Sequence, residues 1–272
     1  MKAQTPIRPD SSIAAEFWQD GRSESCPVYD MHAHPGPCKY TCVPRSEPAD
    51  MVQAMDAAGI RLVCISHQAG LFGPDLGNRP AVEAVREFPD RFRAYLSVNP
   101  HYPEALEREL AEFDDMRDVY VGLKFLPDYH KVKISDGRYR RALEFAEERG
   151  VLLLSHTYGG SRFNGAAEVR HVAENYPNIR LLMAHCLKAD WREAAAIARE
   201  HPHAYLDLTG VLGQWGAVEL LCEEAGSGKV LFGTDAPLYS QREAIGQLLS
   251  ADITDADIHN ICHRNAEALL GL

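Results

Sequence analysis

The fold of this chain is decided around residues 27–35, which read PVYDMHAHP. The apolar and aromatic residues at the start of this stretch predict a short strand over Val28–Met31. Because alternate side chains of a strand share a face, His32 and His34 are expected to point the same way. Two imidazoles on one face can reach one metal ion, and imidazole suits zinc, iron, nickel and copper. Asp30 has the same parity and is either a side chain that orients the histidines or a buried polar group.

Outward from this stretch, a short apolar run, a polar loop and a helical pattern recur about every 30 residues. The apolar runs are Val28–Met31, Arg61–Ser66, Arg93–Val98, Val119–Leu126, Val151–Ser155, Ile179–Ala184, Ala204–Leu208 and Val230–Gly233. Eight runs is the number that closes a parallel barrel, and near-continuous apolar runs are typical of strands buried on both faces. We therefore predict an α/β chain with a single (β/α)8 TIM barrel over residues 27–272. Residues 1–26 form a short N-terminal extension in this prediction.

The segments between the runs have helical spacing. Residues 103–113 begin with a proline and continue with apolar side chains one helical turn apart, and residues 139–150 end on a glycine. A helical turn or two is expected within Ile13–Trp18. Residues 35–48 and 68–80 are interpreted as long loops that follow the first and second strands. Long loops at the carboxyl ends of barrel strands are where active sites form.

Composition excludes several classes of function. The chain has 272 residues, of which 46% are hydrophobic and 25% charged, as expected of a globular protein with a sizeable core. A net charge of −11 argues against general binding to nucleic acid or to a membrane surface. The seven cysteines are scattered and odd in number, and neither a signal-peptide core nor a membrane-spanning run is evident. We expect a cytoplasmic protein with a small-molecule substrate, and homo-oligomerisation is left open.

Polar side chains close five of the predicted strands. They are His32 and His34 on the first, Lys124 on the fourth, His156 on the fifth, His185 on the sixth and Asp235 on the eighth. In a closed barrel the carboxyl ends of all strands form one rim, so residues far apart in the chain meet there. Burying such groups is costly unless they are paired or bound to something. Their placement favours a functional site over structural histidines.

These residues resemble the motifs of the metal-dependent amidohydrolase superfamily. The closest resemblance is to its amidohydrolase-related branch, which includes aminocarboxymuconate-semialdehyde decarboxylase. The motifs are Asp-x-His-x-His at 30–34, Gly-x-Lys at 122–124, the strand-end residues His156 and His185, Gly-Thr-Asp at 233–235 and Asn265-Ala266. The resemblance covers nearly all of residues 27–272.

The resemblance implies one divalent metal ion held by His32, His34, His156 and Asp235. Zinc is the ion we favour, with manganese or iron as alternatives. Asp235 would also orient a metal-bound water or accept its proton. His185 is assigned to acid–base catalysis and not to metal ligation, although a role as ligand to a second metal is the alternative.

Four residues are assigned to substrate binding: Lys124, His67, Tyr158 and Arg162. Lys124 is expected to pair with a substrate carboxylate as a point charge. The alternatives are a carboxylated lysine that bridges two metals, and a lysine that reaches out to solvent. Either Arg162 or Lys188 can hold an anionic group.

The leading interpretation is an enzyme, a metal-dependent hydrolase that uses metal-activated water on a small acidic, lactone or amide substrate. The alternative is a lyase, a non-oxidative decarboxylase or hydratase, because both chemistries stabilise developing negative charge with the same residues. A catalytically silent binding barrel is the third interpretation, and the intact residue set argues against it.

Overall fold

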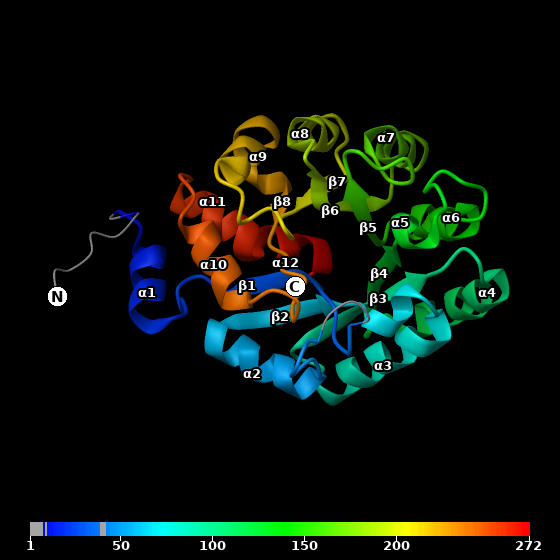
Figure 1. Cartoon of the computed structure of the whole chain (residues 1–272), viewed down its shortest axis with the longest axis horizontal. Helices are drawn as coiled ribbons and strands as arrows, with labels where there is room; N and C mark the ends of the chain where they lie inside the picture. Colours follow the sequence, from blue (N-terminus) through cyan, green and yellow to red (C-terminus); the bar gives the residue numbers. More distant parts are fainter. Residues whose placement is uncertain (1–7, 9, 39–41) are drawn as a thin grey trace.

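The structure is a computed structural model that describes residues 8, 10–38 and 42–272. Within these residues eight parallel strands form one sheet in sequence order (Figure 1). The strands are β1 (Val28–Ala33), β2 (Ile60–Ile65), β3 (Phe92–Val98), β4 (Tyr120–Phe125), β5 (Leu152–Tyr158), β6 (Arg180–Lys188), β7 (Ala204–Asp207) and β8 (Val230–Leu231). The end of the sheet returns to its beginning, because the Met31 amide donates to the Phe232 carbonyl at 2.9 Å and Ala33 bridges to Ala236. The predicted single (β/α)8 barrel is confirmed.

Helices surround the strands (Figure 1). They are α1 (Ser12–Asp20), α2 (Pro48–Ala58), α3 (Pro74–Glu87), α4 (Pro103–Glu112), α5 (Pro127–His130), α6 (Arg140–Arg149), α7 (Ala166–Asn175), α8 (Trp191–Glu200), α9 (Ala217–Ala225), α10 (Gln241–Leu249), α11 (Asp255–His259) and α12 (Asn265–Leu270). Shorter 3₁₀ segments are η1 (Gln68–Leu71), η2 (Asp114–Met116) and η3 (Ser227–Lys229), and η4 (Asn260–Arg264) is a π-helical segment. None of the helices in the described part of the chain has the length and apolar character that crossing a membrane requires.

The barrel has two apolar layers. An inner cluster fills the barrel with alternate strand residues, among them Met31, Tyr95, Leu154 and Leu182. A larger outer cluster lies between the strands and the helices and includes other strand residues, among them Ala33, Val63 and Leu153. This alternation is the expected consequence of strands whose two faces are both buried.

Helix α3 departs from the loop predicted over residues 68–80. Three glycines and two prolines in this stretch suggest a loop, yet α3 begins at Pro74 and carries Pro80 in its interior. Tertiary contacts overcome the local preference. The buried Asn78 side chain accepts from the Ser97 amide at 2.8 Å and donates to its carbonyl at 3.1 Å. Gly77 lies so close to Gly70 that a side chain there would meet its backbone.

Helix α1 lies before the barrel and packs on its side. Ser11 caps it by accepting from the Ala14 amide at 3.1 Å, and Ile13 and Phe17 are buried. The Phe17 and Trp18 rings lie against α10 at Gly246. The helix is longer than the turn or two predicted for Ile13–Trp18.

Candidate metal centre

The end of β1 does not follow simple alternation. The register with β2 shifts between Asp30 and Ala33, which is the mark of a β-bulge. His32 therefore lies on the barrel side with His34. Asp30 is fully buried, as one of its two predicted alternatives has it, and its side chain does not contact the histidine rings. The Asp30 carboxylate instead accepts from the backbone amide of His32, from Thr234 and from Gln241 Nε2. It fastens β1 to the segment after β8, and burial raises its pKa to about 7.

Three of the predicted ligands converge at the carboxyl end of the barrel. His32 Nε2 and His34 Nε2 are 3.1 Å apart, and Asp235 Oδ1 lies 3.2 Å from each of them. The two histidines extend from β1, and the aspartate follows β8, more than 200 residues later in the chain. Their ligand atoms all lie within 4.8 Å of one another, the spacing of a group that can hold a metal ion.

Hydrogen bonds determine which ring nitrogen each histidine offers. His32 Nδ1 lies 2.6 Å from Asp207 Oδ2, and His34 Nδ1 lies 2.8 Å from the Ser66 carbonyl oxygen. An ionised carboxylate and a carbonyl only accept hydrogen bonds, so both Nδ1 atoms carry the proton. Both Nε2 atoms consequently present lone pairs to each other and to the Asp235 carboxylate. Lone pairs this close repel unless a cation lies among them, so the donor set fits a metal ion.

Electrostatics keep these groups in the forms that bind metal. Burial, followed by the charge of Lys124, lowers the pKa of His32 well below its usual value. Burial alone would raise the pKa of Asp235, but His32, His34 and His185 outweigh it and hold that pKa well below the ordinary range. The imidazole is thus neutral and the carboxylate ionised near neutral pH.

His156 and His185 form a second pair beside this cluster. His185 Nδ1 lies 3.0 Å from the Thr209 carbonyl oxygen and therefore carries the proton. His185 Nε2 then accepts from His156 Nδ1 at 3.0 Å, which leaves a lone pair on His156 Nε2. His156 lies outside the group of three converging ligands. The ring centroids of His32 and His185 are 5.4 Å apart, so the pair adjoins the cluster.

Lys124 is completely buried on β4 and reaches the same cluster. Its Nζ donates to His32 Nε2 at 2.7 Å. Burial lowers the pKa of Lys124 to about 8, against the opposing effect of Asp235 and Asp207. The solvent-directed alternative for this lysine is wrong, because the side chain is enclosed.

The backbone carries strain at two of the predicted site residues. His185 has a φ of 67° and Asp235 a φ of 62°, both in the left-handed region that non-glycine residues seldom adopt. Cys186 and Leu187, which follow His185, also have positive φ. Such conformations cost roughly 1–3 kcal/mol each and gather at functional sites.

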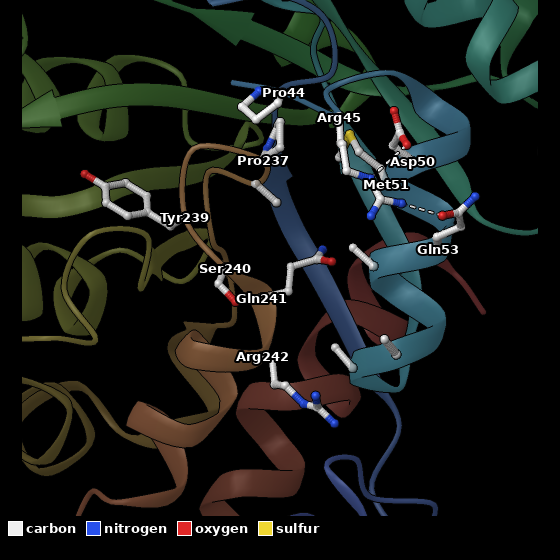
Figure 2. Close-up of a pocket in the computed structure, with 14 residues that line it drawn as sticks. Pro44, Arg45, Asp50, Met51, Gln53, Pro237, Tyr239, Ser240, Gln241 and Arg242 are labelled. Atoms are coloured by element: carbon white, nitrogen blue, oxygen red, sulfur yellow. Dashed lines mark hydrogen bonds and ion pairs between the residues drawn. The ribbon is translucent and has the colours of Figure 1, made fainter. Parts of the chain in front are cut away.

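A pocket of about 680 Å³ opens next to the histidine pair and is lined by His156, Tyr158 and Lys188, with Tyr129 and Lys131. The Tyr158 ring centroid is 4.9 Å from that of His156, so this predicted substrate residue lies beside the site. A second pocket, of about 490 Å³, lies between α2 and the segment before α10 (Figure 2). Its lining holds none of the predicted site residues, so the first pocket is the better place for a substrate.

The remaining predicted substrate residues contact residues outside the group of three ligands. Arg162 is exposed, and its guanidinium lies over the neighbouring Phe163 ring at 4.6 Å. His67 caps η1 through its Nδ1, which accepts from the Ala69 amide at 3.1 Å. Its ring packs against Gly36, where a φ of 92° and the lack of a side chain leave it room.

Asp207 is the site residue that the sequence analysis missed. It ends β7 and is completely buried. Its Oδ2 accepts a hydrogen bond from His32 Nδ1, and its Oδ1 accepts from the Thr209 amide and hydroxyl. Burial raises its pKa to about 6. A carboxylate inside the apolar run Ala204–Leu208 was the available signal, because such a group needs a partner.

Comparisons with known proteins agree with this geometry. The family model described as Amidohydrolase matches residues 29–272. No curated protein matches the chain significantly. Among solved structures, 2,6-dihydroxybenzoate decarboxylase from Rhizobium is 17% identical, covers 90% of this chain and 98% of its own, and has a TM-score of 0.68.

Two further solved structures have the same fold. The 5-carboxyvanillate decarboxylase of Sphingomonas paucimobilis is 13% identical, with a TM-score of 0.71 and coverage of 92% of this chain and 100% of its own. A dihydroxybenzoic acid decarboxylase from Polaromonas, solved with bound manganese, is 17% identical, with a TM-score of 0.67 and coverage of 91% and 97%. At 13–17% identity the likeness to these structures shows the fold alone. The family model matches residues 29–272, which is most of the sequence, and therefore shows the family. The chain belongs to the amidohydrolase family.

Proposed function

We propose that this chain is a metal-dependent lyase that removes carbon dioxide from a small aromatic carboxylic acid without an oxidant. The observation that carries the proposal is the cluster of lone-pair atoms on His32, His34 and Asp235, with the Lys124 ammonium beside it. Solved structures with a similar fold include decarboxylases of hydroxylated benzoates. The predicted lyase alternative is therefore better supported than the leading hydrolase interpretation.

His32, His34 and Asp235 would hold the divalent ion, and the lone pair on His156 Nε2 makes that residue the fourth ligand. The sequence favours zinc, while manganese is bound in a structural relative. Imidazole and carboxylate donors accept both ions. When bound, the ion supplies a Lewis acid that holds an anionic substrate oxygen.

The chain's own residues would bind the substrate and move a proton. Lys124 would pair with the substrate carboxylate from its place beside His32. The Tyr158 ring and Lys188 line the neighbouring pocket and suit an aromatic anion. Decarboxylation breaks the bond to the carboxylate carbon and leaves the electron pair on the ring, which then takes up a proton. His185 would deliver that proton: its Nδ1 donates to the Thr209 carbonyl, so its Nε2 would first take up a proton from solvent and then pass it to the ring.

Hydrolysis is the second candidate. It is supported by the family match and by the ionised Asp235, which can accept a proton from an attacking water. A small lactone or amide would then occupy the same pocket. The two functions differ in the bond that breaks and hence in the product.

Product analysis separates the two candidates. Protein stripped of metal and reloaded with manganese or zinc is incubated with hydroxylated benzoates and, separately, with small lactones and amides. We expect carbon dioxide release from the benzoates, abolished by a chelator and restored by the ion. Ring opening or amide cleavage without carbon dioxide release would establish the hydrolase instead. A metal-loaded protein that is inactive on both panels would contradict the proposal for these substrate classes.

A further inference from the structure

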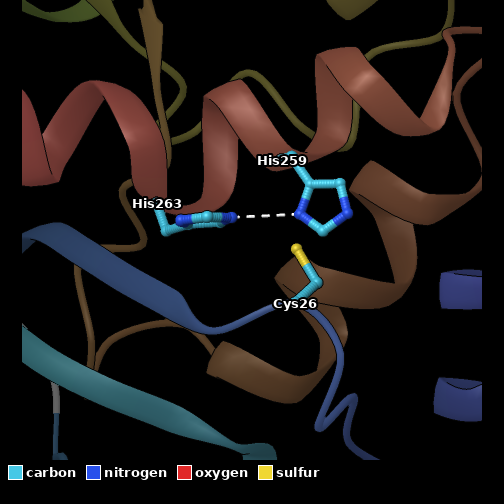
Figure 3. A group of neighbouring side chains, drawn as sticks. All are labelled: Cys26, His259 and His263. Carbon is cyan, nitrogen blue, oxygen red and sulfur yellow. Dashed lines mark hydrogen bonds between the residues drawn. The ribbon is translucent and has the colours of Figure 1, made fainter.

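A second group of side chains that could hold a metal ion lies before the amino-terminal end of β1 (Figure 3). Cys26 precedes β1, and His259 and His263 come from α11 and η4, near the end of the chain. One donor atom from each of the three residues lies within 4.8 Å of the other two. Cys26 precedes His32 by six residues of largely extended chain, so the two groups are separated by roughly 20 Å.

The two histidines are oriented as metal ligands are. His263 Nδ1 lies 3.1 Å from Glu267 Oε2; because a carboxylate only accepts, His263 Nδ1 carries the proton and donates this hydrogen bond. His263 Nε2 therefore carries a lone pair, and it lies 3.0 Å from His259 Nδ1. A carboxylate that fixes the far nitrogen of an imidazole is the common outer partner of metal-binding histidines.

The helix that carries these histidines is locally widened. Within η4 the Asn265 amide donates to the Asn260 carbonyl, the five-residue spacing of a π-helix. Single π-turns of this kind are frequent at functional sites. The same turn carries Cys262, a buried thiol in hydrogen-bond contact with Cys26. A second sulfur thus lies next to the first, although outside the group of three.

We infer that Cys26, His259 and His263 form a structural binding site for a zinc-type divalent cation. Two imidazole nitrogens and a thiolate are donors that structural zinc prefers, and nitrogens held at about 2.0 Å from zinc lie roughly 3.3 Å apart. The site joins the segment before β1 to the last helices. The Phe232 amide, next to β8, donates to the Ile261 carbonyl in the same turn, so the cation would fix the amino-terminal end of the seam between β1 and β8.

Cobalt substitution tests this site without relying on enzymatic activity. The full-length protein, reduced with a phosphine and stripped of metal, is titrated with Co²⁺ and its near-ultraviolet spectrum is recorded. Thiolate ligation gives a sulfur-to-cobalt charge-transfer band, which histidine and carboxylate ligands at the other end of the barrel do not produce. We expect the band in the wild-type protein and in His32→Ala, and its loss in Cys26→Ser.

Matched variants guard against unfolding. His263→Gln should lose the band or weaken Co²⁺ binding at least 10-fold, while Cys222→Ser, a thiol outside the cluster, should keep it. Circular dichroism establishes that each variant is folded. The inference is overturned if the fully reduced wild-type protein gives no band, or if folded Cys26→Ser retains it.

Discussion

At the scale of single residues, the candidate metal centre depends on acceptors that fix the Nδ1 protons of two histidines. Asp207 holds His32 and the Ser66 carbonyl holds His34, so both rings present Nε2 to Asp235. The sequence predicted His32, His34 and Asp235, because each closes a strand. The place of Asp207 inside an apolar run indicated a buried carboxylate that needs a partner, but the sequence could not identify that partner, which lies 175 positions away. Nor could parity predict the surroundings of Asp30, because a bulge interrupts the strand.

Removing a metal donor should abolish both metal binding and turnover. His32→Ala removes a nitrogen donor, and Asp235→Asn replaces an anionic carboxylate with a neutral amide, so the remaining donors bind a divalent ion too weakly to retain it. Metal content after dialysis and the rate of product formation measure the effect. His171→Ala, on the exposed face of α7, is the control and should behave as the wild type. Full metal content in both folded site variants would show that the ligands lie elsewhere.

His185→Asn should separate metal binding from catalysis. The side chain lies beside the cluster and is hydrogen-bonded to Thr209 and His156. General acid–base residues contribute roughly 10²–10⁴-fold to a rate, and we expect a loss of that order with the metal retained. A metal assay and a rate measurement on the same sample are needed. Loss of metal together with activity would identify His185 as a ligand, in favour of the two-metal alternative.

Asp207→Asn tests the partner of a ligand. The amide oxygen can still accept from His32 Nδ1, but the negative charge that strengthens that hydrogen bond is lost. Replacing such partners typically weakens metal affinity about 10–100-fold, which a competition titration with a chelator would detect. An unchanged affinity in the folded variant would remove Asp207 from the account of the site.

At the scale of secondary-structure elements, the sequence predicted the strands best, because their apolar runs recur at regular intervals along the chain. The strands begin and end within a few residues of the apolar runs, because strands buried on both faces need unbroken apolar sequence. Helix α3 could not be predicted in the same way. Its stability comes from Asn78 and from the close approach of Gly77 to Gly70, and both are contacts with other elements.

Asn78→Ala should therefore destabilise the fold. The Ser97 amide and carbonyl would lose their partners, at about 1–3 kcal/mol for each buried group left unsatisfied. The free energy of unfolding, measured by urea denaturation, should fall accordingly. Arg79→Ala, next along the helix, removes only an exposed ion pair with Glu83 and should change it by about 0.5 kcal/mol or less. Equal stabilities of the two variants would refute the tertiary explanation for α3.

At the scale of the whole molecule, the metal centre lies across the seam of the barrel. His32 and His34 come from the end of the first strand and Asp235 from just beyond the last, and backbone hydrogen bonds join the two segments there, among them that from the Asp235 amide to the His32 carbonyl. An ion held by all three links the two ends of the sheet. The predicted boundary between an N-terminal extension, residues 1–26, and the barrel, residues 27–272, stays a prediction. Helix α1, within the extension, packs closely on α10 of the barrel.

Metal binding should accordingly stabilise the folded chain. A ligand present at a hundred times its dissociation constant adds about 2.7 kcal/mol to the free energy of unfolding. Manganese is the ion to use, because it prefers oxygen and nitrogen donors over the thiolates of the cluster at the other end of the barrel. We expect Mn²⁺ to raise the melting temperature of the wild type but not that of His34→Ala. An equal rise in both would place the bound ion outside the seam.

The central claim is that a divalent ion binds among His32 Nε2, His34 Nε2 and Asp235 Oδ1. Anomalous diffraction from crystals grown with Mn²⁺, recorded on both sides of the manganese absorption edge, tests it most directly. The account predicts a peak within bonding distance of all three atoms, with His156 Nε2 as the fourth protein ligand. Well-ordered side chains at the carboxyl end of the barrel with no peak among them, or a peak only at another place in the molecule, would contradict it.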